Sequence, residues 1–200
     1  MCCRYYLDKE LLEELYRQFH GLPRAMQLPL GAAEVFPTDA APALRTQAGG
    51  SELFWPRWGF AVPGRRSPAV NARAETAAAR PLFAESFLHR RCLLPASRFF
   101  EWDAAPGKTK YAFVRADGAP LLLAGLWRPV PDGAQFTVLT AAANASMAPV
   151  HDRMPVLIAP GDADAYLADA AAAAALIAAP GPALARAAEL APGGGEQLHL

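Results

Sequence analysis

The chain has 200 residues, no formal net charge at pH 7 and a 53% hydrophobic composition. This length suits one domain with a sizeable core, and the neutral total excludes the overall basic field of many nucleic-acid-binding proteins. Three cysteines without C-x-x-C spacing predict neither a disulfide framework nor a metal site. The N-terminus lacks the apolar region of a signal peptide, and no run is apolar enough to span a bilayer. We therefore expect a soluble cytoplasmic protein without metal or cofactor.

Charge is unevenly distributed along this neutral chain. Between Trp55 and Arg98, eight arginines oppose two glutamates, which gives a local net charge of +6. From Met154 onward the net charge is −4. A basic surface on a neutral protein fits an anionic ligand. An ordinary solvated arginine-rich face is an equally good interpretation of the charges alone.

The first half of the chain alternates turn signals with short apolar segments. Apolar residues recur at helical spacing from Lys9 to Phe19, followed by glycine and proline, which predicts a helix that ends there. A proline inside residues 34–38 predicts a turn-rich edge segment. The further predictions are a strand at 43–46, a turn at 49–50, an aromatic strand or turn at 54–60, a loop at 63–68 and a helix at 80–91.

The second half contains short β-rich segments separated by Pro-Gly and Asp-Gly turns. Many short strands with few helices predict an α+β fold: a single domain with a mainly antiparallel, barrel-like sheet and a few flanking helices. We place this domain at residues 2–167 and assign 168–200 to an alanine- and glycine-rich tail, partly helical or disordered. The predicted strands cover 92–95, 99–103, 111–115, 121–127, 136–140 and 154–158, and a short helix opens at 162.

Cys2 is the first candidate for chemistry. A small residue after the initiator permits removal of Met1, which leaves a free α-amine and a free thiol on one residue. Their ordinary pKa values of about 8 and about 8.5 leave neutral amine and some thiolate at neutral pH. Such a 1,2-aminothiol reacts with aldehydes by forming an imine and closing a thiazolidine ring. Taken alone, a cysteine at this position is more often incidental.

Other polar residues stand in settings that permit chemistry. Glu101 lies among aromatic residues, where the pKa of a carboxyl group is raised and the group can exchange protons near neutral pH. Alternatively, Glu101 faces water from an edge strand. His151 can shuttle protons or be a surface residue. Asn71 and Arg73 can bind a sugar oxygen and a phosphate, or only cap and pair locally.

Together these residues form an ordered set of blocks. The blocks occur in this order: Met1-Cys2, Trp58-Gly59-Phe60, the segment N-A-R-x-E-T from Asn71, Arg91-Cys92-Leu93-Leu94-Pro95, F-E-W around Glu101 and H-D-R-M-P from His151. The chain in this respect resembles the SRAP family (SOS-response-associated peptidase domain proteins), which shield abasic sites in DNA. The resemblance covers roughly residues 2–167.

The resemblance implies a covalent mechanism and a single-stranded DNA partner. Cys2 would crosslink to the ring-opened aldehyde of an abasic site, Asn71 would hold the opened sugar, and Glu101 and His151 would transfer protons. The same site would remove the residue before Cys2 as a peptidase, with lyase-like chemistry on DNA. The residues expected to contact DNA are Arg4, Trp58, Arg73, Thr140 and Arg153, with Trp102 as a second stacking candidate. We expect a monomer that associates with the nucleoid when bound to DNA.

Departures from the family pattern affect the periphery of this site. Cys3 stands where relatives usually have glycine, and Glu34-Val35-Phe36-Pro37-Thr38 replaces Asn-Val-Ala-Pro-Gly. Arg65-Arg66 occupies the loop where some members have a tryptophan pair, and the usual lysine- and asparagine-bearing ending is absent.

Two rival functions remain: a non-covalent single-stranded nucleic-acid binder, which would keep its affinity in Cys2→Ser, and an N-terminal-nucleophile protease acting on peptides.

Overall fold

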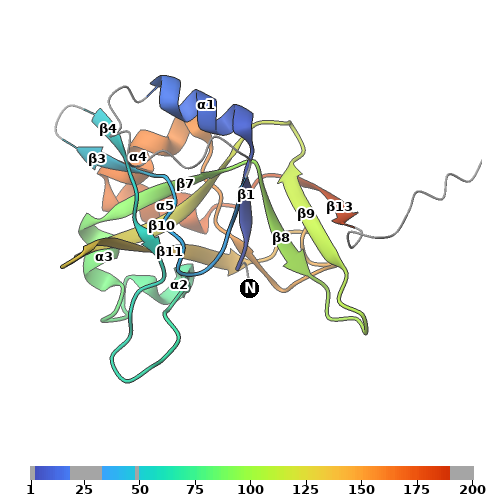
Figure 1. Cartoon of the computed structure of the whole chain (residues 1–200), viewed down its shortest axis with the longest axis horizontal. Helices are drawn as coiled ribbons and strands as arrows, with labels where there is room; N and C mark the ends of the chain where they lie inside the picture. The colour runs from blue at the N-terminus through green and yellow to red at the C-terminus, as the bar shows by residue number, and fades with distance from the viewer. Residues whose placement is uncertain (1–2, 19–32, 48–49, 190–200) are drawn as a thin grey trace, which may run out of the picture.

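Two curled, mainly antiparallel sheets form the framework of this α/β domain (Figure 1). The computed structural model describes residues 3–18, 33–47 and 50–189. The strands are β1 (Tyr5–Leu7), β2 (Ala33–Val35), β3 (Ala43–Gln47), β4 (Gly50–Phe54), β5 (Arg57–Trp58), β6 (Asn71–Arg73), β7 (Arg91–Ala96), β8 (Arg98–Trp102), β9 (Lys110–Arg115), β10 (Leu121–Val130), β11 (Gly133–Ala142), β12 (Arg153–Pro155) and β13 (Leu184–Glu189). The helices are α1 (Lys9–Gln18), α2 (Ala74–Ala77), α3 (Ala84–His89), the 3-10 helix η2 (Pro160–Asp162), α4 (Ala163–Ala168) and α5 (Ala170–Ala178).

The first sheet has five strands in the order β13-β9-β8-β1-β2. Strand β1 lies between β8 and β2, and Tyr5 is opposite both Phe99 and Val35. Tyr5 and Leu7 are fully buried, whereas Tyr6 between them is only partly buried. This alternation follows from the two-residue period of a strand. One face of the sheet therefore packs on the core and the other faces outward.

The second sheet has the strand order β12-β11-β10-β7-β3-β4, and the short strands β5 and β6 run parallel to β11. After β12 the chain continues between β10 and β11. There the Val156 N–H donates to the Leu139 carbonyl, and the Ala124 N–H donates to the Val156 carbonyl, both at 2.9 Å. This insertion draws β12 against the end of β11, where the candidate site lies.

Aromatic packing joins the two sheets. Trp58 stacks on Phe136 with ring centroids 5.7 Å apart and contacts Tyr5 at 5.3 Å, and all three side chains are fully buried. Such aromatic pairs add roughly 0.5–1.5 kcal/mol beyond area burial. The N-terminal strand is therefore held firmly against the second sheet.

Arg91 is a buried cation at the ends of two helices. Its guanidinium donates to the carbonyl groups of Phe87 and Leu88 at the end of α3, and of Tyr166 and Leu167 near the end of α4. These carbonyls lack partners within their helices, and a positive charge is favourable at a helix C-terminus. Burial lowers the pKa of this guanidinium. Arg91 therefore does not belong to the basic surface to which its sequence position assigned it.

The predicted fold class is confirmed, and most strands lie where the sequence placed them. The first helix is also confirmed up to Gln18, and its predicted end, like the Gly49 turn, extends outside the described residues. The helix predicted at 80–91 is shorter, from Ala84 to His89, because Arg91 already pairs with Leu126 in the sheet. No helix among the described residues is long and apolar enough to cross a membrane.

The segment beyond residue 167 is part of the domain. In α5, Ala173 and Ile177 are buried in the same cluster as Tyr166 and Leu167 of α4. Strand β13 pairs along its whole length with β9, at the edge of the first sheet. The predicted boundary after residue 167 is therefore wrong for residues 168–189, and the last residues of the predicted tail lie outside the described chain.

Candidate functional site

The carboxyl end of β11 gathers several of the polar residues that the sequence singled out. Strand β6 runs parallel to β11 on one side, with Asn71 opposite Val138 and Arg73 opposite Thr140. Strand β12 pairs antiparallel with the same end of β11, which sets Arg153 opposite Ala142. Two blocks far apart in the sequence, N-A-R-x-E-T and H-D-R-M-P, therefore meet at one strand end.

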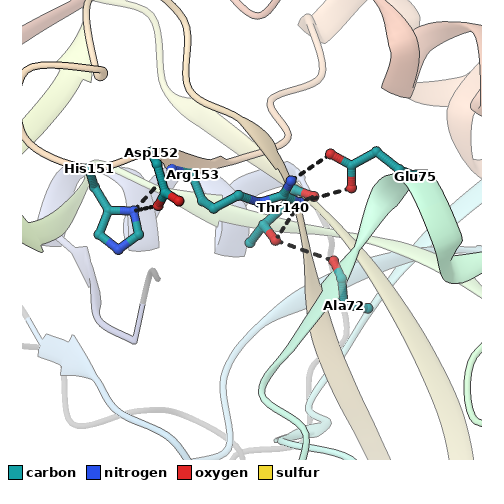
Figure 2. Close-up of polar contacts among 6 residues, drawn as sticks. All are labelled: Ala72, Glu75, Thr140, His151, Asp152 and Arg153. Atoms are coloured by element: carbon teal, nitrogen blue, oxygen red, sulfur yellow. Dashed lines mark hydrogen bonds and ion pairs between the residues drawn. The ribbon is translucent and has the colours of Figure 1, made fainter.

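Arg153 is the centre of a polar network at this strand end (Figure 2). Its Nη1 and Nη2 donate to the two carboxylate oxygens of Glu75, at 2.6 and 2.9 Å. Nη2 also donates to the Thr140 carbonyl oxygen, and the buried Thr140 hydroxyl donates to the Ala72 carbonyl at 3.5 Å. The bond from Arg153 lowers the pKa of the Glu75 carboxyl group. The guanidinium is thus oriented by strand β11 and helix α2 before any ligand binds.

His151 has a partner in each of its protonation states. Its Nδ1 lies 2.8 Å from Asp152 Oδ1 and 3.0 Å from the backbone nitrogen of Arg153 (Figure 2). A protonated Nδ1 donates to the carboxylate, whereas a deprotonated Nδ1 accepts from the backbone N–H. The imidazole can therefore gain or lose a proton without turning, which suits a general acid and base.

A hydrogen-bonded loop between β11 and β12 carries His151. The Ala143 N–H donates to the Asp152 carbonyl at 2.9 Å and closes the loop. Inside it, Asn144 Oδ1 accepts from the N–H of Ser146 at 3.0 Å, and its Nδ2 donates to the Pro182 carbonyl at 2.9 Å. Asn144 was not among the residues predicted from the sequence, although asparagine at the start of a loop is typical of such side-chain turns.

The second group of candidate residues lies at the start of the chain. Glu101 is 3% exposed in β8, and the backbone of its neighbour Phe100 donates to the Arg4 carbonyl at 3.0 Å. The pKa of the Cys3 thiol is raised by partial burial and additionally by the negative charge of Glu101. Glu101 is therefore electrostatically coupled to the residue that follows Cys2. Cys2 itself lies outside the described residues.

The two groups of candidate residues border one core. Tyr5, which follows Arg4 in β1, belongs to the same buried cluster as Val150, which precedes His151. The structure thus brings Asn71, Arg73 and the H-D-R-M-P block together, and brings the N-terminal strand to Glu101.

Arg4 lies between two aromatic rings on the outward face of the first sheet. Its guanidinium carbon is 4.3 Å from the centroid of Phe36 and 5.0 Å from that of Trp102. Glu34 lies 3.4 Å from Arg4 and 2.7 Å from Lys110 Nζ. Glu34 therefore forms ion pairs with two cations.

Two residues predicted to contact DNA are buried. Trp58 is fully buried and its Nε1–H donates to the Val70 carbonyl at 2.8 Å, so the prediction of a stacking platform is wrong for this side chain. Thr140 is also fully buried, which leaves its side chain to orient Arg153 from behind rather than to touch a ligand. By contrast, Arg4 and Arg153 are partly exposed, and Arg73 is exposed.

Comparison with known proteins agrees with this geometry. The family model described as SOS response associated peptidase (SRAP) matches residues 1–190. The chain belongs to the SRAP family. Abasic site processing protein YoqW of Bacillus subtilis (strain 168) is 30% identical over 173 residues, which covers 79% of this chain and 76% of the relative. Abasic site processing protein YedK of Escherichia coli (strain K12) is 36% identical over 110 residues, 52% of this chain and 49% of the relative.

Solved structures of this SRAP fold superpose closely. A protein from Bordetella bronchiseptica has a TM-score of 0.77 and 27% identity, with 95% of this chain and all of that chain covered. A protein from Bacteroides thetaiotaomicron has the same fold, with a TM-score of 0.75 and 18% identity over 94% of this chain and 91% of that one.

Proposed function

We propose that this protein senses abasic sites in single-stranded DNA and crosslinks to them through Cys2. The observation that carries the proposal is the SRAP match over residues 1–190, together with relatives that are named abasic site processing proteins. The residues at which this chain matches the family pattern supply each group that the chemistry needs. Crosslinking would protect the site during the response to DNA damage.

The covalent step conserves atoms in a simple way. After removal of Met1, the Cys2 α-amine adds to the aldehyde carbon of the ring-opened abasic sugar, and loss of one water gives an imine. The Cys2 sulfur then adds to the imine carbon while a proton moves to the nitrogen, which closes a thiazolidine ring. No oxidant or reductant takes part. The product is the protein plus the oligonucleotide minus one water.

Glu101 and His151 are the proton-transfer groups in this proposal. Sugar opening and water loss each require a proton to be moved at a specific atom. Support for Glu101 comes from its burial and its coupling to Cys3, one residue from the nucleophile. Support for His151 comes from its two alternative Nδ1 partners. Asn71, beside β11, would hold the opened sugar.

Cationic side chains would bind the phosphates around the abasic nucleotide. Arg73 is exposed beside the strand end, and Arg4 adjoins the N-terminal cysteines. Arg153 has a carboxylate partner in Glu75, which a phosphate would have to displace or share. Phosphate contacts of this kind give binding that weakens as salt rises.

A crosslinking gel with an abasic single-stranded oligonucleotide tests the proposal. Heat-stable adduct should form with the unmodified protein and with Cys3→Ser, the matched control, but not with Cys2→Ser. An oligonucleotide without an abasic site should give no adduct. Adduct formation by Cys2→Ser, or its loss in Cys3→Ser alone, would contradict the role given to Cys2.

The same experiment separates the rival functions. A non-covalent binder would retain its affinity in Cys2→Ser and form no heat-stable adduct with either protein. If the protein is instead a protease acting on peptides, a peptide substrate should compete with DNA for the site. The peptidase activity of the family would correspond here to removal of Met1, the residue before Cys2. If Glu101 takes part in this cleavage, the Glu101→Gln variant should keep Met1. The cytoplasmic location and the monomeric state are part of the same proposal.

A further inference from the structure

Phe36 is an exposed aromatic ring next to the candidate site. Among the described residues, three large apolar side chains are exposed, and Phe36, at 39% exposure, is the aromatic one. It lies in the segment Glu34-Val35-Phe36-Pro37-Thr38, directly after strand β2. The exposed part of this ring is an apolar aromatic surface that a ligand can cover.

A tight turn fixes the position of this ring. The Phe36 carbonyl accepts from the Asp39 N–H at 3.0 Å, and the Phe36 N–H donates to Asp39 Oδ2 at 2.9 Å. Pro37 occupies the second position and Thr38, with φ of 77°, the third, which defines a type II turn. The Thr38 N–H is bonded to the Trp58 carbonyl at 2.9 Å. The backbone that carries the ring is thus bonded to the buried Trp58 of strand β5 and needs little ordering on binding.

The surroundings of Phe36 favour an unpaired nucleobase. The Arg4 guanidinium lies 4.3 Å from the centroid of the ring and also contacts Trp102, so a cation and two aromatic rings form one continuous row. Proteins that bind single strands combine aromatic faces for the bases with nearby cations for the backbone. Arg4 is one residue from Cys3 and two from the proposed nucleophile, so Phe36 lies within reach of a base that neighbours the abasic nucleotide.

We infer that Phe36 is a stacking platform for a nucleobase adjacent to the abasic site, with Arg4 holding the intervening phosphate. This inference rests on the proposed function and extends it to recognition of the flanking strand. The platform would replace the stacking surface that the buried Trp58 cannot supply. It also gives a reason for the protein to favour unpaired bases over duplex DNA.

The test measures equilibrium binding of oligonucleotides that contain a non-reactive abasic analogue without an aldehyde. Phe36→Ala should weaken binding about five- to 150-fold, the range for loss of one base–aromatic stack, while Phe36→Trp should retain it. Leu88→Ala, at a 50% exposed apolar residue of α3, is the matched control and should bind like the unmodified protein. Removing the flanking base on one side of the analogue should weaken binding by the unmodified protein to a similar degree.

The loss of affinity caused by Phe36→Ala and the loss caused by removing the flanking base should not add, because each change removes the same stack. Phe36→Ala should therefore be insensitive to removal of that flanking base. Equal affinity of Phe36→Ala and the unmodified protein, or fully additive losses, would overturn the inference. A change of oligomeric state in Phe36→Ala with unchanged affinity would instead assign the ring to contact between two copies. If the unmodified protein does not bind the oligonucleotide, the proposed function itself fails.

Discussion

Thr38 occupies a backbone conformation that favours glycine, and Thr38→Gly should stabilise the protein. Thr38 has φ of 77° at the third position of the type II turn, where a β-branched residue is strained. A left-handed conformation costs an L-residue roughly 1–2 kcal/mol. Glycine removes this cost but loses more conformational entropy on folding, roughly 0.5–1 kcal/mol. The Thr38 side chain is exposed, so its deletion removes few contacts.

The expected net gain in the free energy of unfolding therefore lies in the range of about 0–1.5 kcal/mol, and its midpoint of about 0.75 kcal/mol corresponds to a rise in Tm of about 1.5–3 °C for a chain of this size. Thermal and urea denaturation of Thr38→Gly, Thr38→Asn and Thr38→Ala measure it. Asparagine tolerates this conformation and should fall between glycine and threonine. Alanine keeps the Cβ atom and should stay close to threonine. If glycine gave no gain over alanine, the reasoning from strain at Thr38 would be refuted.

Three further changes test the charged groups. Glu34→Asn releases Arg4 from an ion pair and removes a negative charge from the proposed DNA path, so affinity for single-stranded DNA at low salt should rise about threefold to tenfold in a binding titration. Because Arg153 lowers the pKa of Glu75, the unmodified protein should be more stable than Glu75→Gln, and this difference should be complete above pH 4.5, the ordinary pKa of the carboxyl group. Thermal melts should show the difference disappearing as the pH falls below 4.5 and through the lowered pKa of the folded protein; a difference that does not change with pH would contradict the pairing. Arg91→Met leaves buried carbonyls without a donor and should cost at least about 2 kcal/mol in urea denaturation, whereas a neutral effect would show that water replaces the guanidinium.

The sheet was largely predictable because its strands carry strong local signals. Asp117-Gly118 follows the end of β9 and Asp132-Gly133 leads from β10 into β11, and both glycines have positive φ, a conformation that glycine adopts readily. Strand β13 was missed because its sequence is rich in alanine, which favours a helix. Its pairing with β9, a contact distant in sequence, overrides that propensity.

The candidate site was predictable as a set of residues but not as an arrangement. The order of the motifs identified Asn71, Glu101 and His151, yet it could not show that Glu75 holds Arg153 in a two-point ion pair. Burial also depends on the whole fold: arginine and tryptophan both occur on surfaces and inside proteins. For that reason the sequence placed two buried side chains, Arg91 and Trp58, on the surface.

Intact-mass spectrometry of the protein, before and after incubation with an abasic single-stranded oligonucleotide and heating, tests the central claim most directly. The account predicts a protein that lacks Met1 and gains the mass of the oligonucleotide minus one water. Cys2→Ala still has an amine and can form only a reversible imine, so its adduct should not survive heating. Retention of Met1, or a heat-stable adduct on Cys2→Ala, would contradict the account.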